Sequence, residues 1–374
     1  MSSAASSLRL SLCGDVMTGR GIDHALPHPV GSVLYEPYVR DAREYVALAE
    51  KANGPIPHPV SFDYVWGEAL QELERAQVDL RIVNLETAIT SAETHWPHKE
   101  IHYRMHPQNI GCLSAARINA CALANNHILD WGYDGLSETL RTLDEVHISR
   151  AGAGNNANEA AAPAVLNVAG KGGVLLFSFG STTSGVFEEW RATETRAGVN
   201  LLDDLSESTA RRIANQMRQF QQSGDLIIAS IHWGGNWGYD IPRQQIAFSH
   251  RLIEEGVALV HTHSSHHVKA IEVFKGRLIL YGCGDFLTDY EGISGYERFR
   301  GDLALMYLVD VHLQSGQLVS ARLVPMHMRR FRLERVPARD AKWLCNLFNA
   351  LGQPFATQTR LIEDNTLILD WRRE

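Results

Sequence analysis

The chain has 374 residues, of which 45% are hydrophobic and 21% charged; this composition is typical of a soluble globular protein and excludes fibrous, collagen-like and intrinsically disordered classes. The 35 Lys and Arg residues against 43 Asp and Glu residues give a formal net charge of −8. Such a surface argues against a protein that binds nucleic acid or anionic lipid, so an anionic substrate would need local help, such as a metal ion.

The N-terminal segment is small and polar and lacks a basic region, so we predict no secretory signal in the segment Met1–Ser7. There is no apolar run of roughly 18 residues, which predicts no membrane span. The five cysteines are odd in number and show no Cys-x-x-Cys spacing. This pattern predicts reduced, buried thiols in a cytoplasmic protein. The sequence does not predict an oligomeric state.

Short apolar runs alternate with helical patterns over the first three quarters of the chain, which predicts a layered α/β fold. In chain order, the predicted strands are Leu8–Asp15, Leu80–Glu86, Ile118–Asn125, Val174–Phe179, Asp225–His232, Ala258–His263 and Leu278–Gly282. The predicted helices between them are Phe62–Gln77, Tyr133–Val146, Asp203–Gln222 and Pro242–Glu255. The last helix begins with proline, which is favoured in the first turn.

Two regions depart from this alternation. Residues Asp23–Pro59 are rich in Pro, Gly and His, and we predict a long insertion or lid there. Toward the C-terminus, β-rich runs at Asp302–His312 and Leu318–Val324 predict an antiparallel hairpin. We therefore expect one main domain over residues 1–330. Residues 331–374 form an extension packed on it, with a helix at Ala341–Leu351 and a strand at Thr366–Asp370.

Six predicted strands end in side chains that can bind a metal ion. These side chains are Asp15; Glu86; Asn125, Asn126 and His127; His232; the histidines of the segment 261–267; and Asp285. If the strands lie parallel in one sheet, their carboxyl ends converge on one edge, which is where open α/β sheets place their sites. Four of the 17 histidines fall within 261–267, and we expect at least two of them to be ligands.

The chemistry of these donors points to hydrolysis. Carboxylates, amide oxygens and imidazoles without clustered thiols suit manganese, iron or zinc, and disfavour an iron–sulfur or Cys-rich zinc site. A carboxylate such as Glu86 can bridge two ions about 3.5–4 Å apart, and such a pair activates water. The chain lacks both the phosphate-binding P-loop and the Gly-x-Ser-x-Gly elbow, which argues against a nucleotide-driven motor and a serine hydrolase.

Six motifs, taken in order, resemble a known family. They are Gly14-Asp-Val-Met-Thr-Gly-Arg20; Asn84-Leu-Glu86; Leu123-Ala-Asn-Asn-His127 with Leu129-Asp-Trp-Gly132; Gly152-Ala-Gly154; His232-Trp-Gly234; and Gly284-Asp-Phe286. Over residues Leu8–Leu313 the chain resembles the CapA-type poly-γ-glutamate capsule biosynthesis proteins, a branch of the calcineurin-like metallophosphatase superfamily. The resemblance implies a four-layer α/β/β/α sandwich with a dinuclear metal site at the sheet edge.

The function implied is a dinuclear-metal phosphoesterase that uses a metal-bound hydroxide. The alternative is a non-catalytic, peptide-directed or amide-directed role in the biosynthesis or processing of poly-γ-glutamate. The substrate would be a small phosphoester in the first case and a polyanionic chain in the second. The sequence leaves open which centre is attacked and which divalent metal is bound.

The resemblance also implies roles for individual residues. Asp15 would bind the first metal, Glu86 would occupy the bridging position, and the second metal would be bound by Asn126 and His232. His263 and His266 would supply one ligand to each metal. His127 would donate a proton to the leaving group or orient the substrate, while Arg20 and Asn125 would contact the substrate or support the ligands.

This chain departs from the family pattern at three places. The superfamily's Asp-x-His motif is absent, because Val16 and Met17 follow Asp15. The histidine ligands in the segment 261–267 can be assigned differently, to His261 or His267. Asp285 stands where CapA-type proteins commonly have asparagine, so it is expected to be a ligand or an acid–base group.

Overall fold

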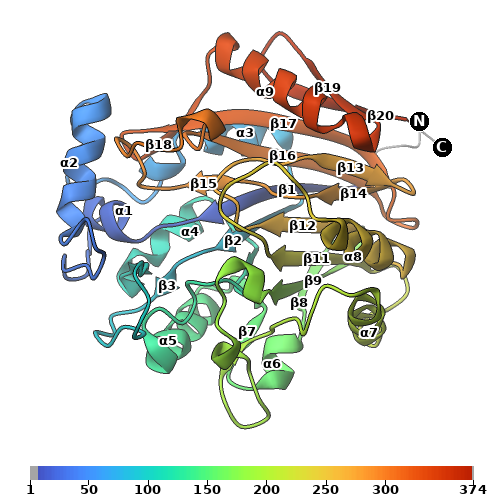
Figure 1. Cartoon of the computed structure of the whole chain (residues 1–374), viewed down its shortest axis with the longest axis horizontal. Coiled ribbons are helices and arrows are strands. Elements are labelled where there is room, and N and C mark those ends of the chain that lie inside the picture. The colour runs from blue at the N-terminus through green and yellow to red at the C-terminus, as the bar shows by residue number, and fades with distance from the viewer. Residues whose placement is uncertain (1–6, 373–374) are drawn as a thin grey trace.

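The computed structural model describes residues 7–372, and its strands form two large sheets (Figure 1). The first sheet follows the order β19-β20-β17-β16-β1-β2-β5-β6, with β15 beside β1 and β18 beside β17. Its strands are β1 (Ser7–Val16), β2 (Leu80–Leu85), β5 (Ala120–Ala122), β6 (Ser149–Ala151), β15 (Asp285–Leu287), β16 (Leu303–His312), β17 (Leu318–Arg329), β18 (Arg332–Arg335), β19 (Thr357–Leu361) and β20 (Leu367–Trp371). The first six residues, on which the signal-peptide prediction rests, lie outside the described residues.

The second sheet has six strands in the order β13-β14-β12-β11-β9-β8. They are β8 (Ala164–Val168), β9 (Gly172–Gly180), β11 (Leu226–His232), β12 (Leu259–His263), β13 (Ile271–Phe274) and β14 (Arg277–Leu280). The central strands β9, β11, β12 and β14 are parallel. In the first sheet β1, β2, β5 and β6 are parallel too, whereas β16 and β17 form the predicted antiparallel hairpin.

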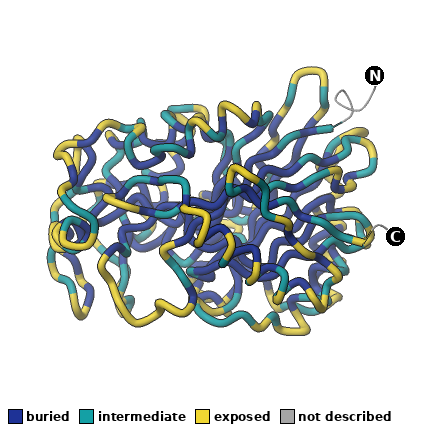
Figure 2. Tube along the Cα trace, turned by 90° about the horizontal axis from the view of Figure 1, so that it is seen from above, coloured by how far each residue is buried: buried dark blue, intermediate teal, exposed yellow. Residues whose placement is uncertain are grey.

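Three apolar cores separate four layers. Side chains such as Leu10 and Leu12 of β1 and Leu176 of β9 fill the core between the two sheets. The alternate residues of the strands face outward, because successive strand side chains point to opposite faces. Phe177 of β9 thus packs with helical residues such as Phe248. The result is the predicted α/β/β/α sandwich, and Figure 2 shows the buried segments gathered along the middle of the molecule.

The helices cover both outer faces. The first sheet is covered by α1 (Arg20–Ala25), α2 (Ala42–Asn53), α3 (Glu68–Ala76), α4 (Gly111–Ala115) and α5 (Gly132–Glu145); the second by α7 (Glu207–Arg218) and α8 (Arg243–Glu254). The short helix α6 (Ala157–Ala161) lies beside β7 (Ala153–Gly154), which pairs with β10 (Gly198–Val199), while β3 (Ala88–Ile89) pairs with β4 (Arg104–Met105). Short 3₁₀ turns occupy 64–66, 107–110, 182–184, 188–190, 297–299 and 353–355.

Several predicted elements need correction. The helix predicted over Phe62–Gln77 begins only at Glu68. Gly67 has a φ of +46°, which separates this helix from the 3₁₀ turn before it. The strand predicted over Ile118–Asn125 is confined to β5, since the backbone turns beyond Ala122 to present its polar residues. The helix predicted over Asp203–Gln222 is shorter at both ends, and the side chain of Ser206 caps its N-terminus.

The segments predicted as an insertion and an extension both contain regular structure. Within Asp23–Pro59 lies α2, whose Tyr45, Val46 and Ala49 are buried against the first sheet's helical core. The C-terminal segment contains α9 (Ala338–Leu351), which packs on β19, and β19 and β20 widen the first sheet (Figure 1). The division at residue 330 stays a prediction, as does a lid function.

Two further sequence predictions concern the cysteines and membrane-spanning helices. All five cysteines are buried, and none forms a disulfide within residues 7–372, as the spacing predicted. In the same range, no helix combines the length and the apolar character that crossing a bilayer requires.

Candidate metal centre

The carboxyl ends of strands from both sheets meet at one place. These strands belong to two sheets. Reasoning from strand ends had assumed a single parallel sheet. The ring of His261 in β12 reaches across to the carbonyl oxygen of Cys13 in β1, with Nε2 at 2.8 Å. The backbone N–H of Ser264 donates to Oδ2 of Asp15 at 3.2 Å. The site is therefore built at the seam between the sheets.

Close packing at the end of β1 requires glycine. A Cβ atom at Gly14 would lie 1.8 Å from the carbonyl oxygen of Gly284, so any side chain there would force β1 and β15 apart. The N–H of Asp15 donates to that same carbonyl at 3.0 Å. The register then pairs Asp15 with Asp285 on adjacent parallel strands, which places two carboxylates side by side.

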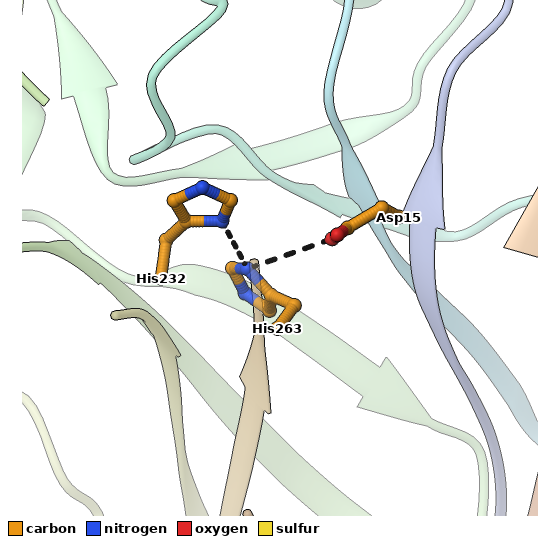
Figure 3. A group of neighbouring side chains, drawn as sticks. All are labelled: Asp15, His232 and His263. Carbon is orange, nitrogen blue, oxygen red and sulfur yellow. Dashed lines mark hydrogen bonds and ion pairs between the residues drawn. The ribbon is translucent and has the colours of Figure 1, made fainter. Parts of the chain in front are cut away.

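Asp15, His232 and His263 form the first group able to hold a cation (Figure 3). Their ligand atoms all lie within 4.8 Å of one another, and all three residues are buried. Nδ1 of His263 lies 2.8 Å from Nδ1 of His232 and 4.0 Å from Oδ1 of Asp15. Burial holds the pKa of both imidazoles well below its ordinary value, so both rings are neutral and able to ligate.

A row of hydrogen-bond contacts runs through these rings, and it has one proton fewer than it has contacts. The contacts run from Asn126 Oδ1 through His232, His263, Ser230 and His261 to the carbonyl oxygen of Cys13, at 3.0, 2.8, 2.9, 3.0 and 2.8 Å. Five contacts need five protons, whereas three neutral imidazoles and one hydroxyl supply four. A cation bound by Nδ1 of both His232 and His263 replaces the contact that lacks a proton, as would rotation of the Asn126 amide. The donors therefore fit a metal ion.

Glu86 lies beside this first group and is held by an amide. The side-chain N–H groups of Asn84 donate to Oδ1 of Asp15 at 2.7 Å and to Oε2 of Glu86 at 3.1 Å. Oε1 of Glu86 lies 3.7 Å from Nε2 of His127 and 3.9 Å from Nε2 of His232. Burial and the neighbouring Asp15 carboxylate raise the pKa of Glu86 well above its ordinary value. A nearby cation would favour the ionised form instead.

Asp15, His266 and Asp285 form a second group of buried side chains with ligand atoms within 4.8 Å of one another. Nδ1 of His266 contacts Oδ1 of Asp285 at 2.9 Å. Burial lowers the pKa of His266, but the charge and hydrogen bond of Asp285 together with the charge of Asp15 leave that pKa above its ordinary value. The other carboxylate oxygen of Asp285, Oδ2, is buried and has no hydrogen-bond partner.

His127 is anchored by two residues that the sequence analysis left without a role. Its Nδ1 lies 2.7 Å from Oδ2 of Asp130 and 2.9 Å from Nζ of Lys99, while Nε2 faces Glu86. Lys99 also hydrogen-bonds Asp130 and the carbonyl oxygen of Ile101. Burial, and then the charge of Lys99, lower the pKa of His127 well below its ordinary value. The imidazole is thus neutral, with one nitrogen fixed and the other directed into the site.

Arg20 and Asn125, predicted to bind the substrate, are both buried and directed at protein groups. The Arg20 guanidinium donates to Glu36 and the Tyr45 hydroxyl, each at 2.9 Å, and forms a two-point pair with Asp289. Asn125 donates to Asn84 at 3.1 Å and to a backbone carbonyl, and its oxygen accepts from the N–H of His127. In this structure Asn125 therefore orders the loop that carries His127.

Three residues of the site were not predicted, and their sequence signals differ in strength. The spacing His127-x-x-Asp130 follows β5 directly and could have suggested a carboxylate that orients a histidine. Asn84 stands two residues before Glu86 on the same strand end. Lys99 gave no signal, because it lies in an irregular segment far along the chain from His127. The alternative ligands His261 and His267 lie apart from both groups: His261 bonds Cys13, and His267 accepts from the N–H of Gly238.

The carboxylate of Asp15 makes the stability of the metal-free protein depend on pH. Burial, then the charge of Asp285, raise the pKa of Asp15 from 3.8 to about 7. Between these values the folded state binds more protons than the unfolded state, so stability falls as the pH rises. We expect the free energy of urea unfolding, measured with a chelator present, to fall between pH 4 and pH 8. This fall should be larger in wild type than in Asp15→Asn by on the order of 1–4 kcal/mol. Equal pH dependence in both proteins would contradict this.

The amino-acid sequence is similar to those of several known bacterial proteins. The profile of the family described as bacterial capsule synthesis protein PGA_cap matches residues 9–290. The chain is 44% identical over 357 residues to a probable polyglutamine synthesis accessory protein of Mycobacterium tuberculosis, covering 95% of this chain and 94% of that protein. It is 20% identical over 322 residues to the capsule biosynthesis protein CapA of Bacillus anthracis, covering 86% of this chain and 68% of that protein. It is 22% identical over 304 residues to the PGA biosynthesis protein CapA of Bacillus subtilis strain 168, covering 80% of this chain and 67% of that protein.

Proposed function

Because this chain belongs to the bacterial capsule synthesis protein family, we propose that it is a metal-dependent hydrolase that serves the synthesis or processing of a glutamate polymer. One relative is named a probable polyglutamine synthesis accessory protein, and another a capsule biosynthesis protein. The observation that carries the hydrolytic part of the proposal is the neutral His127, anchored at one nitrogen and facing a buried cluster of metal-ligating side chains. A purely structural histidine needs no such placement.

The first cation would be held by Asp15, His232 and His263, with Asn126 and Glu86 beside them. A divalent ion at this place supplies Lewis acidity and lowers the pKa of water. The donor set mixes carboxylate and imidazole, which suits manganese, zinc or iron. Asn84 keeps the carboxylates of Asp15 and Glu86 at a fixed spacing through its two hydrogen bonds.

His127 acts on the oxygen of the substrate that gains negative charge. Nδ1 of His127 is held between Oδ2 of Asp130 and Nζ of Lys99, so Nε2 is the nitrogen left to exchange a proton with the substrate. Nε2 faces the site and can pass to the departing oxygen a proton taken up from water. Asp130 accepts from Lys99 and from the N–H of Tyr103, which holds the lysine in place. A phosphoester is the first candidate substrate, and the amide of a polyglutamate chain is the second.

The proposal is tested by measuring bound metal and hydrolysis together. Purified protein is reconstituted with Mn²⁺ or Zn²⁺, dialysed and assayed against a panel of phosphomonoesters and phosphodiesters and against poly-γ-glutamate of defined length. We expect hydrolysis that disappears with chelator and returns with metal. Calorimetric, metal-dependent binding of poly-γ-glutamate without any bond cleavage would instead support the non-catalytic role in polymer synthesis and would overturn the hydrolase.

A further inference from the structure

A cavity of about 1100 Å³ adjoins the candidate metal centre. It is lined by His266, by Thr288 just after β15, and by Arg335 on β18. Most of its lining lies beyond residue 290, where the match to the family profile ends. Ligand pockets usually measure about 300–1,000 Å³. This cavity can therefore hold more of a ligand than the group that reacts at a metal ion.

Two hydroxyl groups of the lining near His266 lack good acceptors. Thr288 is 4% exposed, and its Oγ1 is buried without a hydrogen-bond partner. The hydroxyl oxygens of Tyr290 and Tyr103 lie 2.6 Å apart, so one of them donates to the other. The second proton of this pair has only Sδ of Met17, 3.9 Å from the Tyr290 hydroxyl, and a thioether is a weak acceptor. A ligand that brings oxygen acceptors would satisfy both groups.

The third donor of the lining is a guanidinium without a counter-ion. Arg335 donates through Nη2 to the carbonyl oxygen of Asp364 and to Oγ1 of Thr366, while its Nη1 is buried and has no acceptor. Within residues 7–372 it forms no ion pair, whereas Arg300 of the same cavity is paired with two carboxylates. A carboxylate matches the planar guanidinium and would supply the missing charge.

The carboxylates of the same lining are already bound by the protein. Glu291 accepts from two backbone N–H groups at 2.7 and 2.6 Å, and Glu334 pairs with Arg330 at 3.2 Å. Glu297 accepts from a backbone N–H at 2.9 Å, and the two aspartates are those paired with Arg300. The lining groups that still need a partner are therefore donors, which indicates a ligand rich in acceptor oxygens.

The cavity also has a flat aromatic wall. The rings of Trp237 and Tyr296, which both line it, stack with their centroids 4.1 Å apart and an angle of 3° between their planes. Trp237 contacts the ring of His266 at a centroid distance of 5.6 Å, so this wall begins beside the metal centre. Such rings offer a large and rigid contact area to an apolar or planar part of a ligand.

We propose that this cavity binds an extended, amide-linked chain that carries carboxylate groups. Thr288 and Tyr290 donate to its oxygens beside the metal centre, and Arg335 pairs with a carboxylate further along it. The inference rests on the proposed function only in placing the reacting bond at the metal centre. Polyglutamate, the second candidate substrate, has this chemistry, whereas a small phosphoester would leave the Arg335 subsite empty.

The test compares two short chains that differ only in charge. Synthetic tetra-γ-glutamate and the same tetramer with its carboxylates amidated are titrated calorimetrically into the full-length protein, once with Mn²⁺ and once with chelator. We expect the acidic tetramer to bind wild type at least about 10-fold more tightly than the amidated one. In Arg335→Gln the affinity for the acidic tetramer should fall by about 10–100-fold, with and without metal, and in Thr288→Val by about 3–10-fold.

The matched control is Arg360→Gln, which removes an exposed arginine of β19 that pairs with Asp370 and does not line the cavity. It should bind the acidic tetramer like wild type. Circular dichroism and thermal unfolding establish that each variant is folded, since Arg335 also holds the turn at Asp364. If Arg335→Gln does not fold, Thr288→Val and the comparison of the two tetramers on wild type still decide.

Three outcomes would overturn the inference: no binding of the acidic tetramer to wild type, equal affinity for both tetramers, or wild-type affinity in folded Arg335→Gln. Failure of the proposed function is separate. Binding that depends on Arg335 without any hydrolysis would leave the subsite standing and refute the hydrolase. Hydrolysis of the chain with the same KM in wild type and Arg335→Gln would refute only the subsite.

Discussion

Replacing His127 by alanine is expected to lower the turnover of a phosphoester substrate by about 10²–10³-fold, because the substitution removes the imidazole nitrogen that exchanges a proton with the departing oxygen. The bound metal should be unchanged, since the cation ligands lie on other residues. The measurement is steady-state hydrolysis by the metal-loaded variant, together with elemental analysis. The KM should change little if the imidazole acts mainly in the transition state.

The matched control is His147→Asn, which alters an exposed histidine after the end of α5. His147 has a φ of +58°, a conformation that asparagine tolerates, so the control should keep both its fold and its activity. Unchanged turnover in His127→Ala would exclude His127 from the reaction. Loss of metal together with turnover would show instead that His127 supports the ligands.

Replacing Arg20 by methionine is expected to lower the free energy of unfolding by about 3–5 kcal/mol, because it leaves two buried carboxylates without their cation. Arg20, Glu36 and Asp289 are each no more than 3% exposed, and all are joined in one network with the Tyr45 hydroxyl. The guanidinium also stacks over the ring of Tyr45 at 4.0 Å. Urea unfolding at constant pH and metal concentration measures the effect.

Arg43→Met is the matched control, because Arg43 forms an exposed ion pair with Asp41. Exposed pairs contribute about 0–1 kcal/mol, so that variant should unfold close to wild type. If Arg20→Met does not fold, Tyr45→Phe removes one hydroxyl from the same network and should cost about 1–3 kcal/mol. Wild-type stability in Arg20→Met combined with a raised KM would assign Arg20 to substrate binding, as the sequence motif predicted.

Much of the candidate site can be read from strand ends. Asp15 and His232 each stand at the end of a short apolar run, and a run of this kind predicts both a strand and the position of its carboxyl end, whereas Asp285 begins β15. The ordered motifs also pointed to the family, and the comparisons confirm the family. Local pattern suffices for such inferences because a strand's end and the residue on it are neighbours in the chain.

Contacts between segments that are far apart in the chain cannot be predicted from such local patterns. Lys99 reaches His127 from an irregular segment, and the hydroxyl of Ser230 lies between two histidines only because β11 and β12 pair in register. Both depend on how separate elements pack. The need for glycine at position 67 also depends on packing, since a Cβ atom there would lie 2.2 Å from the carbonyl oxygen of Leu333 in β18.

The sequence by itself determined the α/β class, the C-terminal hairpin and the set of carboxylates, amides and imidazoles available for a metal. Tertiary structure alone decided which strands of the two sheets bring these residues together, that Asp15 stands between β2 and β15, and that Asp285 is left with an unpaired oxygen. The physical reason is that apolar periodicity fixes which face of a strand is buried. Strand order, register and the seam between two sheets depend instead on packing among residues hundreds of positions apart.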